Sequence, residues 1–238
     1  MFSAKKLMTR VFFLLLIVTL TAITVFGQTG KLLARKPVPD ISDSLDIHYA
    51  RLAKEFGEHK DIPSGYEKQV LYALSYFPEL KHTKIRFKIK KGSRGIIATR
   101  PTIGSLLRRS SKRTYIVVIN DSTNGSSFPA FPKSDVNGQV GILGHEFCHI
   151  VYFNNSTGLN LLGLAISHIS RRYMDRFEYK TDSMDIERGL GYQLIAWNEY
   201  LQKGFRAMYP NRSMPAGLTV VSKRYMSIEQ IKKQMATK

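Results

Sequence analysis

The sequence predicts an α+β fold in which a small β-sheet packs against helices. Residues 84–90 alternate between apolar and basic side chains, which is typical of a half-buried strand. Residues 115–119 (YIVVI) form the continuous apolar run of a more central strand. Residues 44–56 and 136–153 instead repeat apolar side chains every three or four positions, as amphipathic helices do.

The composition is that of one globular domain. The chain has 238 residues, of which 43% are hydrophobic and 23% charged, and this balance excludes a disordered chain. Its formal net charge is +18. Three of the 36 basic residues and no acid lie in residues 1–27, so the remainder still carries +15. Such a surplus favours an anionic envelope surface as partner, and the alternative is a solvated basic surface without a dedicated partner.

The first segment, residues 1–27, is expected to be a signal peptide. Basic residues precede an uncharged apolar run at residues 11–27, and Val25 and Gly27 suit the −3 and −1 positions of a cleavage site before Gln28. An uncleaved N-terminal anchor is the alternative, since 17 residues are at the short limit for a membrane span. We therefore expect a periplasmic or secreted protein, or an inner-membrane anchored one whose domain faces the periplasm and contacts the membrane only through this run.

Residues 28–43 are expected to form a basic linker, because they are rich in Lys, Arg and Pro and lack an apolar period. Residues 44–238 then form the folded domain. Its first helix spans residues 44–56, and a second helix lies between Pro63 and Pro78. The apolar side of the first helix holds Leu45, Tyr49, Leu52 and Phe56.

The predicted sheet follows these helices. Residues 84–90 point Ile85, Phe87 and Ile89 to one side and Lys84, Arg86, Lys88 and Lys90 to the other. A second short strand is expected at residues 95–100, before the central strand at residues 115–119. Residues 120–135 are rich in Ser, Gly, Asn and Pro and form a loop. Its Phe128 and Phe131 either tuck into the core or wall a substrate cleft.

The helix at residues 136–153, with Asp135 as its N-cap, carries the motif His145-Glu146-Phe147-Cys148-His149. Histidines four residues apart on one helical face can bind one metal ion, and Glu146 then points at the open position where water binds. The alternative is a pair of core histidines bound to backbone acceptors. The core stripe of this helix is Val140, Leu143, Phe147 and Val151, on a different side from the histidines.

A third metal ligand is expected between residues 159 and 188, which are helical by pattern. Glu178 and Asp182 are four residues apart and share a helical face. One carboxylate can bind the metal, and the other can accept a hydrogen bond from the outer N–H of a ligand histidine. The rival carboxylates in this segment are Asp175, Asp185 and Glu187.

The pair of motifs His145-Glu146-x-x-His149 and Glu178-x-x-x-Asp182 resembles that of the gluzincin metallopeptidases, most of all the CAAX-prenyl-protease-type and related bacterial envelope peptidases. The resemblance covers residues 114–190. It implies a zincin-like fold and a Zn²⁺ ion, with His145, His149 and Glu178 as ligands, Glu146 as catalytic base and Asp182 as the carboxylate that accepts a hydrogen bond from a ligand histidine. Thr181 departs from the alanine that the family often has, and the multiple membrane spans are absent, which disfavours a prenyl-protein substrate.

The expected function is thus an exported zinc metalloendopeptidase acting on peptide or protein substrates, with no specific nucleic acid. The alternative is a non-catalytic envelope-binding protein on a degenerate zinc peptidase fold. Tyr192 is a candidate for stabilising the oxyanion, or else a core tyrosine. His168 is expected to be a buried, hydrogen-bonded histidine. Cys148 is the only cysteine, which excludes an intrachain disulfide, and we expect it to pack as a small apolar residue.

The remaining helices are expected at residues 192–206 and 227–235. Trp197 in the first of them is expected to pack behind the metal-binding helices. Ser227 is the expected N-cap of the second.

Overall fold

The structure is a computed structural model of the whole chain. Its described residues are 35–91, 96–106, 108–121, 130–158, 160–161, 171–209 and 224–237. The expected signal peptide and the first seven residues of the expected linker lie outside them, as do Phe128 and His168.

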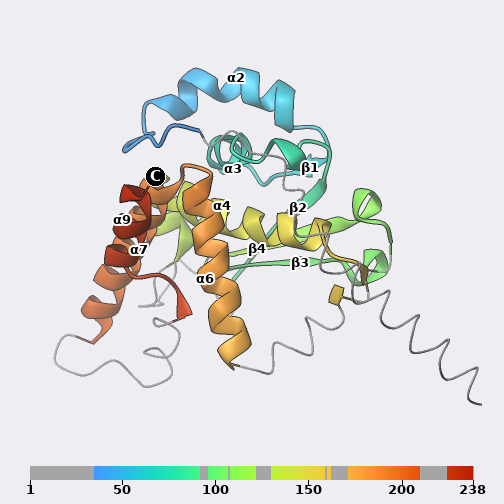
Figure 1. The fold of residues 1–238 in the computed structure, drawn as a ribbon. Coiled ribbons are helices and arrows are strands. Elements are labelled where there is room, and N and C mark those ends of the chain that lie inside the picture. Colours follow the sequence, from blue (N-terminus) through green and yellow to red (C-terminus); the bar gives the residue numbers. More distant parts are fainter. Residues whose placement is uncertain are drawn as a thin grey trace, which may run out of the picture. The chain divides into compact units, whose positions relative to one another are not determined.

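A mixed four-stranded sheet has the strand order β1-β2-β4-β3 (Figure 1). The strands are β1 (Lys60–Asp61), β2 (Lys84–Lys90), β3 (Ile97–Pro101) and β4 (Thr114–Asn120). β1 pairs with β2 and β2 with β4 in parallel, whereas β3 pairs with β4 antiparallel. The three strands expected from the sequence are therefore confirmed, with β3 one or two residues later than expected.

The two faces of the sheet differ in chemistry. Ile85 and Phe87 of β2 are buried, as are Tyr115, Val117 and Ile119 of β4, and these side chains form the inner face. Ile89, one residue before the end of β2, is 37% exposed, although its spacing assigns it to the same face. The basic residues of β2 are all exposed, so the predicted basic outer face is confirmed.

Helix α4 (Val136–Asn154) is the central element of the domain. Asp135 caps it, since its Oδ1 accepts a hydrogen bond of 2.7 Å from the backbone N–H of Gly138. Nearly every residue from Gly138 to Phe153 is buried, because α4 packs against α3, β3, α6 and α7 (Figure 1). A helix that is covered on all sides can hold polar side chains in a dry environment.

Glycines on one side of α4 allow a close approach of α7 (Gly191–Met208). A Cβ atom added to Gly141 would lie 2.3 Å from the backbone carbonyl of Gln193, and one added to Gly138 would lie 3.3 Å from the backbone of Trp197. Trp197 is itself buried, so its expected place behind the metal-binding helix is confirmed.

The N-terminal helices are α2 (Ser44–Phe56) and α3 (Glu67–Leu74), followed by the 3-10 turn η2 (Pro78–Leu80). Tyr49 is 37% exposed, whereas the other three apolar residues expected on the α2 stripe are buried. Before α2, Ile41 is fully buried, and an Nη of Arg35 donates a hydrogen bond of 2.9 Å to Ser75. Residues 35–43, at the end of the expected linker, thus pack on the domain.

The remaining elements complete an α+β fold with six α-helices among the described residues. They are α6 (Arg171–Glu187), α9 (Ile228–Ala236) and the 3-10 turns η3 (Ile103–Ser105), η4 (Ser110–Lys112) and η5 (Phe131–Lys133). Phe131 is fully buried, which confirms its place in the core, and Ser227 caps α9 as expected. None of the described helices is both long and apolar enough to cross a membrane.

Candidate metal centre

Core packing on one side of α4 fixes the direction of the motif histidines on the other. The ring of Phe147 lies edge-on to Phe77 and Phe87, at centroid distances of 5.5 and 6.2 Å. Phe147 therefore packs α4 against the inner face of the sheet. His145 and His149 project from a different side, toward α6, with their ring centroids 4.8 Å apart.

Glu178 of α6 meets both histidines. Its Oε2 lies 3.1 Å from Nε2 of His145 and 3.4 Å from Nε2 of His149. The three side chains are buried and offer ligand atoms that all lie within 4.8 Å of one another. Neighbouring ligands of a tetrahedral zinc ion with bonds of 2.0–2.1 Å are about 3.3 Å apart. The two distances from Glu178 match this spacing, and the three residues expected as metal ligands form a group that could hold a metal ion.

Asp182 lies one helical turn further along α6 and orients His145. Its Oδ1 is 2.8 Å from Nδ1 of His145, and its Oδ2 accepts a hydrogen bond of 2.8 Å from the backbone N–H of Met226. The carboxylate is only 1% exposed. Because Nδ1 faces Asp182, Nε2 is the nitrogen of His145 that faces Glu178 and His149.

The charges of this cluster are strongly coupled. Burial alone would raise the pKa of Glu178, but hydrogen bonding to His145 and His149 outweighs it and holds that pKa far below its usual range. Burial alone would lower the pKa of His145, but the carboxylates of Asp182 and Glu178 together raise it well above 6.5. Without metal, the cluster is thus stabilised by a positive His145 between two negative carboxylates.

Glu146, the residue after His145, is buried at 5% exposure. Its charge acts on Tyr225 together with that of Glu178. Oε2 of Glu146 has no hydrogen-bond partner within the part of the chain that the structure describes, and neither has Nδ1 of His149. This oxygen is therefore able to accept a hydrogen bond from a water molecule or a substrate.

Aromatic rings enclose His149. Its ring stacks on Phe177 at a centroid distance of 5.1 Å and on Phe153 at 6.2 Å. Tyr152 lies edge-on to Phe177 at 4.9 Å. This apolar shell limits the rotation of the imidazole and excludes water from one side of the site.

Tyr225 is a residue of the site that the sequence did not indicate. Its ring lies 5.6 Å from that of His145. Burial raises the pKa of Tyr225 strongly, and the negative charges of Glu178, Glu146 and Asp182 raise it further. The hydroxyl is therefore protonated at neutral pH and can donate a hydrogen bond. No local pattern could have found it, because it lies in a short segment before α9, far from both motifs.

The rival carboxylates do not join the ligand group. Asp175 pairs with Arg224 at 3.2 Å, and Glu187 is exposed. Asp185 is fully buried, and a Cβ atom added to Gly144 would lie 2.4 Å from its Oδ1. Burial, together with the charge of Asp182, raises the pKa of Asp185 well above 3.8.

Cys148 and Tyr192 differ in their burial. Cys148 is 1% exposed, and burial raises the pKa of its thiol, so its expected role as a packed apolar residue is confirmed. Tyr192 is 40% exposed on α7, which contradicts a core position for it. Tyr225, and not Tyr192, is the tyrosine in ring contact with His145.

Comparison of the chain with protein-family models, with curated proteins and with solved structures finds no match.

Proposed function

We propose that this protein is a zinc-dependent metallopeptidase with a zincin-like catalytic domain. The observation that carries the proposal is the convergence of Nε2 of His145, Nε2 of His149 and Oε2 of Glu178, while Glu146, the residue after His145, is also buried. Two imidazoles and one carboxylate are a donor set that suits zinc and that leaves a fourth position open.

The ligand roles follow from the contacts of each side chain. His145, His149 and Glu178 would hold the metal, and Asp182 would fix the tautomer of His145 through the bond to Nδ1. When bound, a zinc ion supplies a Lewis acid that activates water and polarises a carbonyl group.

Glu146 would act as the general base and then as the general acid. Its free Oε2 can take a proton from the attacking water and deliver it to the leaving amine. Tyr225, whose ring contacts that of His145 and whose raised pKa keeps its hydroxyl protonated, would donate a hydrogen bond to the oxygen that becomes negative in the transition state. A peptide bond needs both functions, because its amine leaves poorly and its carbonyl oxygen gains charge.

Export, which residues 1–27 predict, is part of the proposal. The periplasm or the external medium would then supply peptide or protein substrates. The non-catalytic alternative explains the basic face of the sheet, but it assigns no role to the buried carboxylate of Glu146.

The test combines metal analysis with one substitution. The purified protein should contain about one zinc ion per chain, and Glu146→Gln should keep that zinc while losing cleavage of a casein or peptide-library substrate by at least about 100-fold. Glu187→Gln, an exposed carboxylate on α6, is the matched control and should keep full activity. A protein without bound metal, or a Glu146→Gln variant that cleaves normally, would refute the proposal.

A further inference from the structure

We infer that the outer face of the four-stranded sheet docks the domain on the anionic lipid headgroups of a bilayer. The basic sheet face consists of five exposed residues: Lys84, Arg86, Lys88 and Lys90 on β2, and Arg100 on β3. Asp61 is the single acidic residue in the four strands. This inference does not depend on the proposed peptidase activity.

The sheet register places these cations on one plane. Arg86 and Arg100 are both Cα partners of Ile116 on β4, so the two arginines flank the same apolar residue. Alternate residues of a strand are about 6.6 Å apart, so the four cations of β2 extend over about 20 Å. No residue of the basic sheet face forms an ion pair among the described residues. Their charge is therefore free to attract an external anion.

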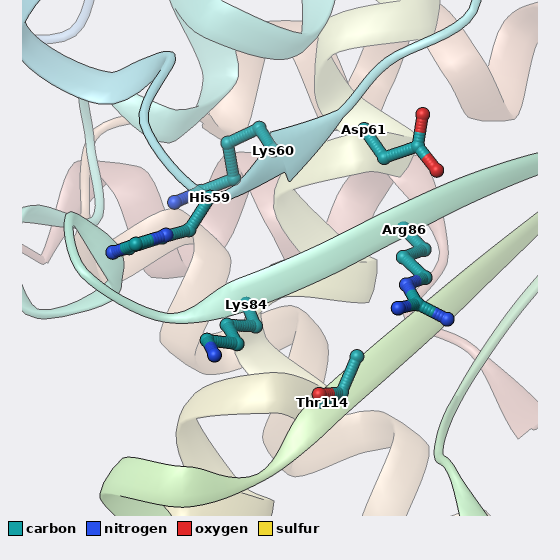
Figure 2. Close-up of a pocket in the computed structure, with 6 residues that line it drawn as sticks. All are labelled: His59, Lys60, Asp61, Lys84, Arg86 and Thr114. Carbon is teal, nitrogen blue, oxygen red and sulfur yellow. The ribbon is translucent and has the colours of Figure 1, made fainter.

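One end of the face is hollowed into a shallow basic pocket of about 350 Å³. Figure 2 shows Lys84 and Arg86 projecting from β2 on the same side as Thr114 of β4, while Asp61 points its carboxylate away from Lys84 and Thr114. Burial lowers the pKa of Lys60, which also lines the pocket, to about 8. Ammonium, guanidinium and hydroxyl donors around one hollow suit a phosphate group.

A lipid surface fits this face better than a nucleic acid does. Single-stranded nucleic acids bind through aromatic side chains that stack on bases, and the outward residues of β2, β3 and β4 include none. Val118, the register partner of Lys88, is instead a partly exposed apolar residue between the cations, whereas Ile116 is buried between Arg86 and Arg100. In the sequence, only residues 28–34 separate the apolar run from Arg35. Seven extended residues span at most about 25 Å, so an uncleaved run would hold the domain close to the bilayer.

Docking by this face would keep the metal centre on the far side of α4 from the lipid. The inner face of the sheet contacts α4 through Phe87 and Phe147, whereas the histidines project from another side of α4 toward α6. The basic sheet face and the metal centre are thus separated by both the sheet and α4. A bilayer held against the sheet would orient the site away from the lipid.

Vesicle binding by the full chain tests the inference. The protein is cosedimented with phosphatidylcholine vesicles and with mixed phosphatidylcholine–phosphatidylglycerol vesicles. The ratio of the two bound amounts measures the preference for anionic lipid. Binding through the apolar run contributes to both amounts and therefore largely cancels in this ratio. The sheet variant replaces Lys84, Arg86, Lys88 and Lys90 by Gln. The control variant replaces Lys54, Lys203, Lys232 and Lys233, which are exposed on α2, α7 and α9, and it removes the same net charge.

The wild type should prefer anionic vesicles, and this preference should weaken with salt. The sheet variant should reduce the preference at least about tenfold, and the control variant should leave most of it. Equal losses in both variants, or no preference in the wild type, would overturn the inference. So would a sheet variant that loses affinity for a single-stranded oligonucleotide but keeps its vesicle preference.

Pairwise variants guard against misfolding of the fourfold variant. Lys84→Gln with Arg86→Gln, and Lys88→Gln with Lys90→Gln, should each retain the wild-type circular dichroism spectrum and lose an intermediate part of the lipid preference. If neither pair changes the preference, the basic sheet face is not the docking surface.

Discussion

Nδ1 of His145 lies 2.8 Å from Oδ1 of Asp182, and both groups are almost completely buried. This contact connects two helices that are separated in the sequence, and it decides which nitrogen of His145 faces Glu178. A ligand histidine whose outer nitrogen is held by a carboxylate is more basic and less mobile.

We expect Asp182→Asn to weaken zinc binding by about 10–100-fold, because the amide removes the negative charge that supports His145. Zinc affinity can be measured by competition with a chromogenic chelator. Asp175→Asn is the control, since Asp175 lies on the same helix but pairs with Arg224. Equal affinities for both variants would contradict the orienting role of Asp182.

We expect Tyr225→Phe to lower kcat by about 100–1,000-fold while zinc content stays unchanged, because the variant loses one donor to the developing oxyanion. Single-turnover cleavage of a fluorogenic peptide would measure the effect. Tyr192→Phe should behave like the wild type, since Tyr192 is exposed. A Tyr225→Phe variant with normal kcat would assign Tyr225 to packing alone.

We expect Gly141→Ala to destabilise the fold by about 1–3 kcal/mol. The added methyl group would lie 2.3 Å from the backbone of Gln193, so α7 would have to move away from α4. Chemical denaturation gives the free energy of unfolding. Gly104→Ala, which meets no atom within 4 Å, should change it by less than about 1 kcal/mol. Similar values for both variants would show that the helix contact is adaptable.

The stability of the metal-free protein should fall as pH rises above neutral. The pKa of His145 is raised in the fold, so its contribution is fully present below 6.5 and is lost as pH rises through the raised value. Zinc must displace this proton, so the gain in Tm on adding zinc should grow over the same pH range. Scanning fluorimetry with and without chelator checks both trends. A zinc effect that shrinks as pH rises would contradict the assignment of His145 as ligand.

Periodicity was sufficient for the parts of the fold that alternate or repeat clearly. The strand Lys84–Lys90 and the helices Ser44–Phe56 and Val136–Asn154 occur where the pattern of apolar residues places them. The two-residue strand Lys60–Asp61 was missed, because two residues are too few to show the alternation of apolar and polar side chains that marks a strand. Helix α3 begins at Glu67, after the Pro63 and Ser64 expected to open it, since the proline precedes a turn in the structure.

The site was predictable where its residues follow helical spacing. His145 with His149, and Glu178 with Asp182, each lie four residues apart, and the structure brings the two pairs together. Tyr225, which contacts His145, carries no such signal. Its position depends on how the chain returns from α7 to α9, which is a tertiary relationship without local periodicity.

The hydrogen bond from the N–H of Met226 to Asp182 links the metal centre to the order of biosynthesis. A ribosome makes both histidines, Glu178 and Asp182 well before it makes Met226. Until Met226 and the adjacent Tyr225 emerge, Asp182 lacks the hydrogen bond from the N–H of Met226. The ring of His145 also lacks its contact with the ring of Tyr225. The nascent chain therefore carries all its ligands but not the finished site, and the centre matures only after α7 has been synthesised.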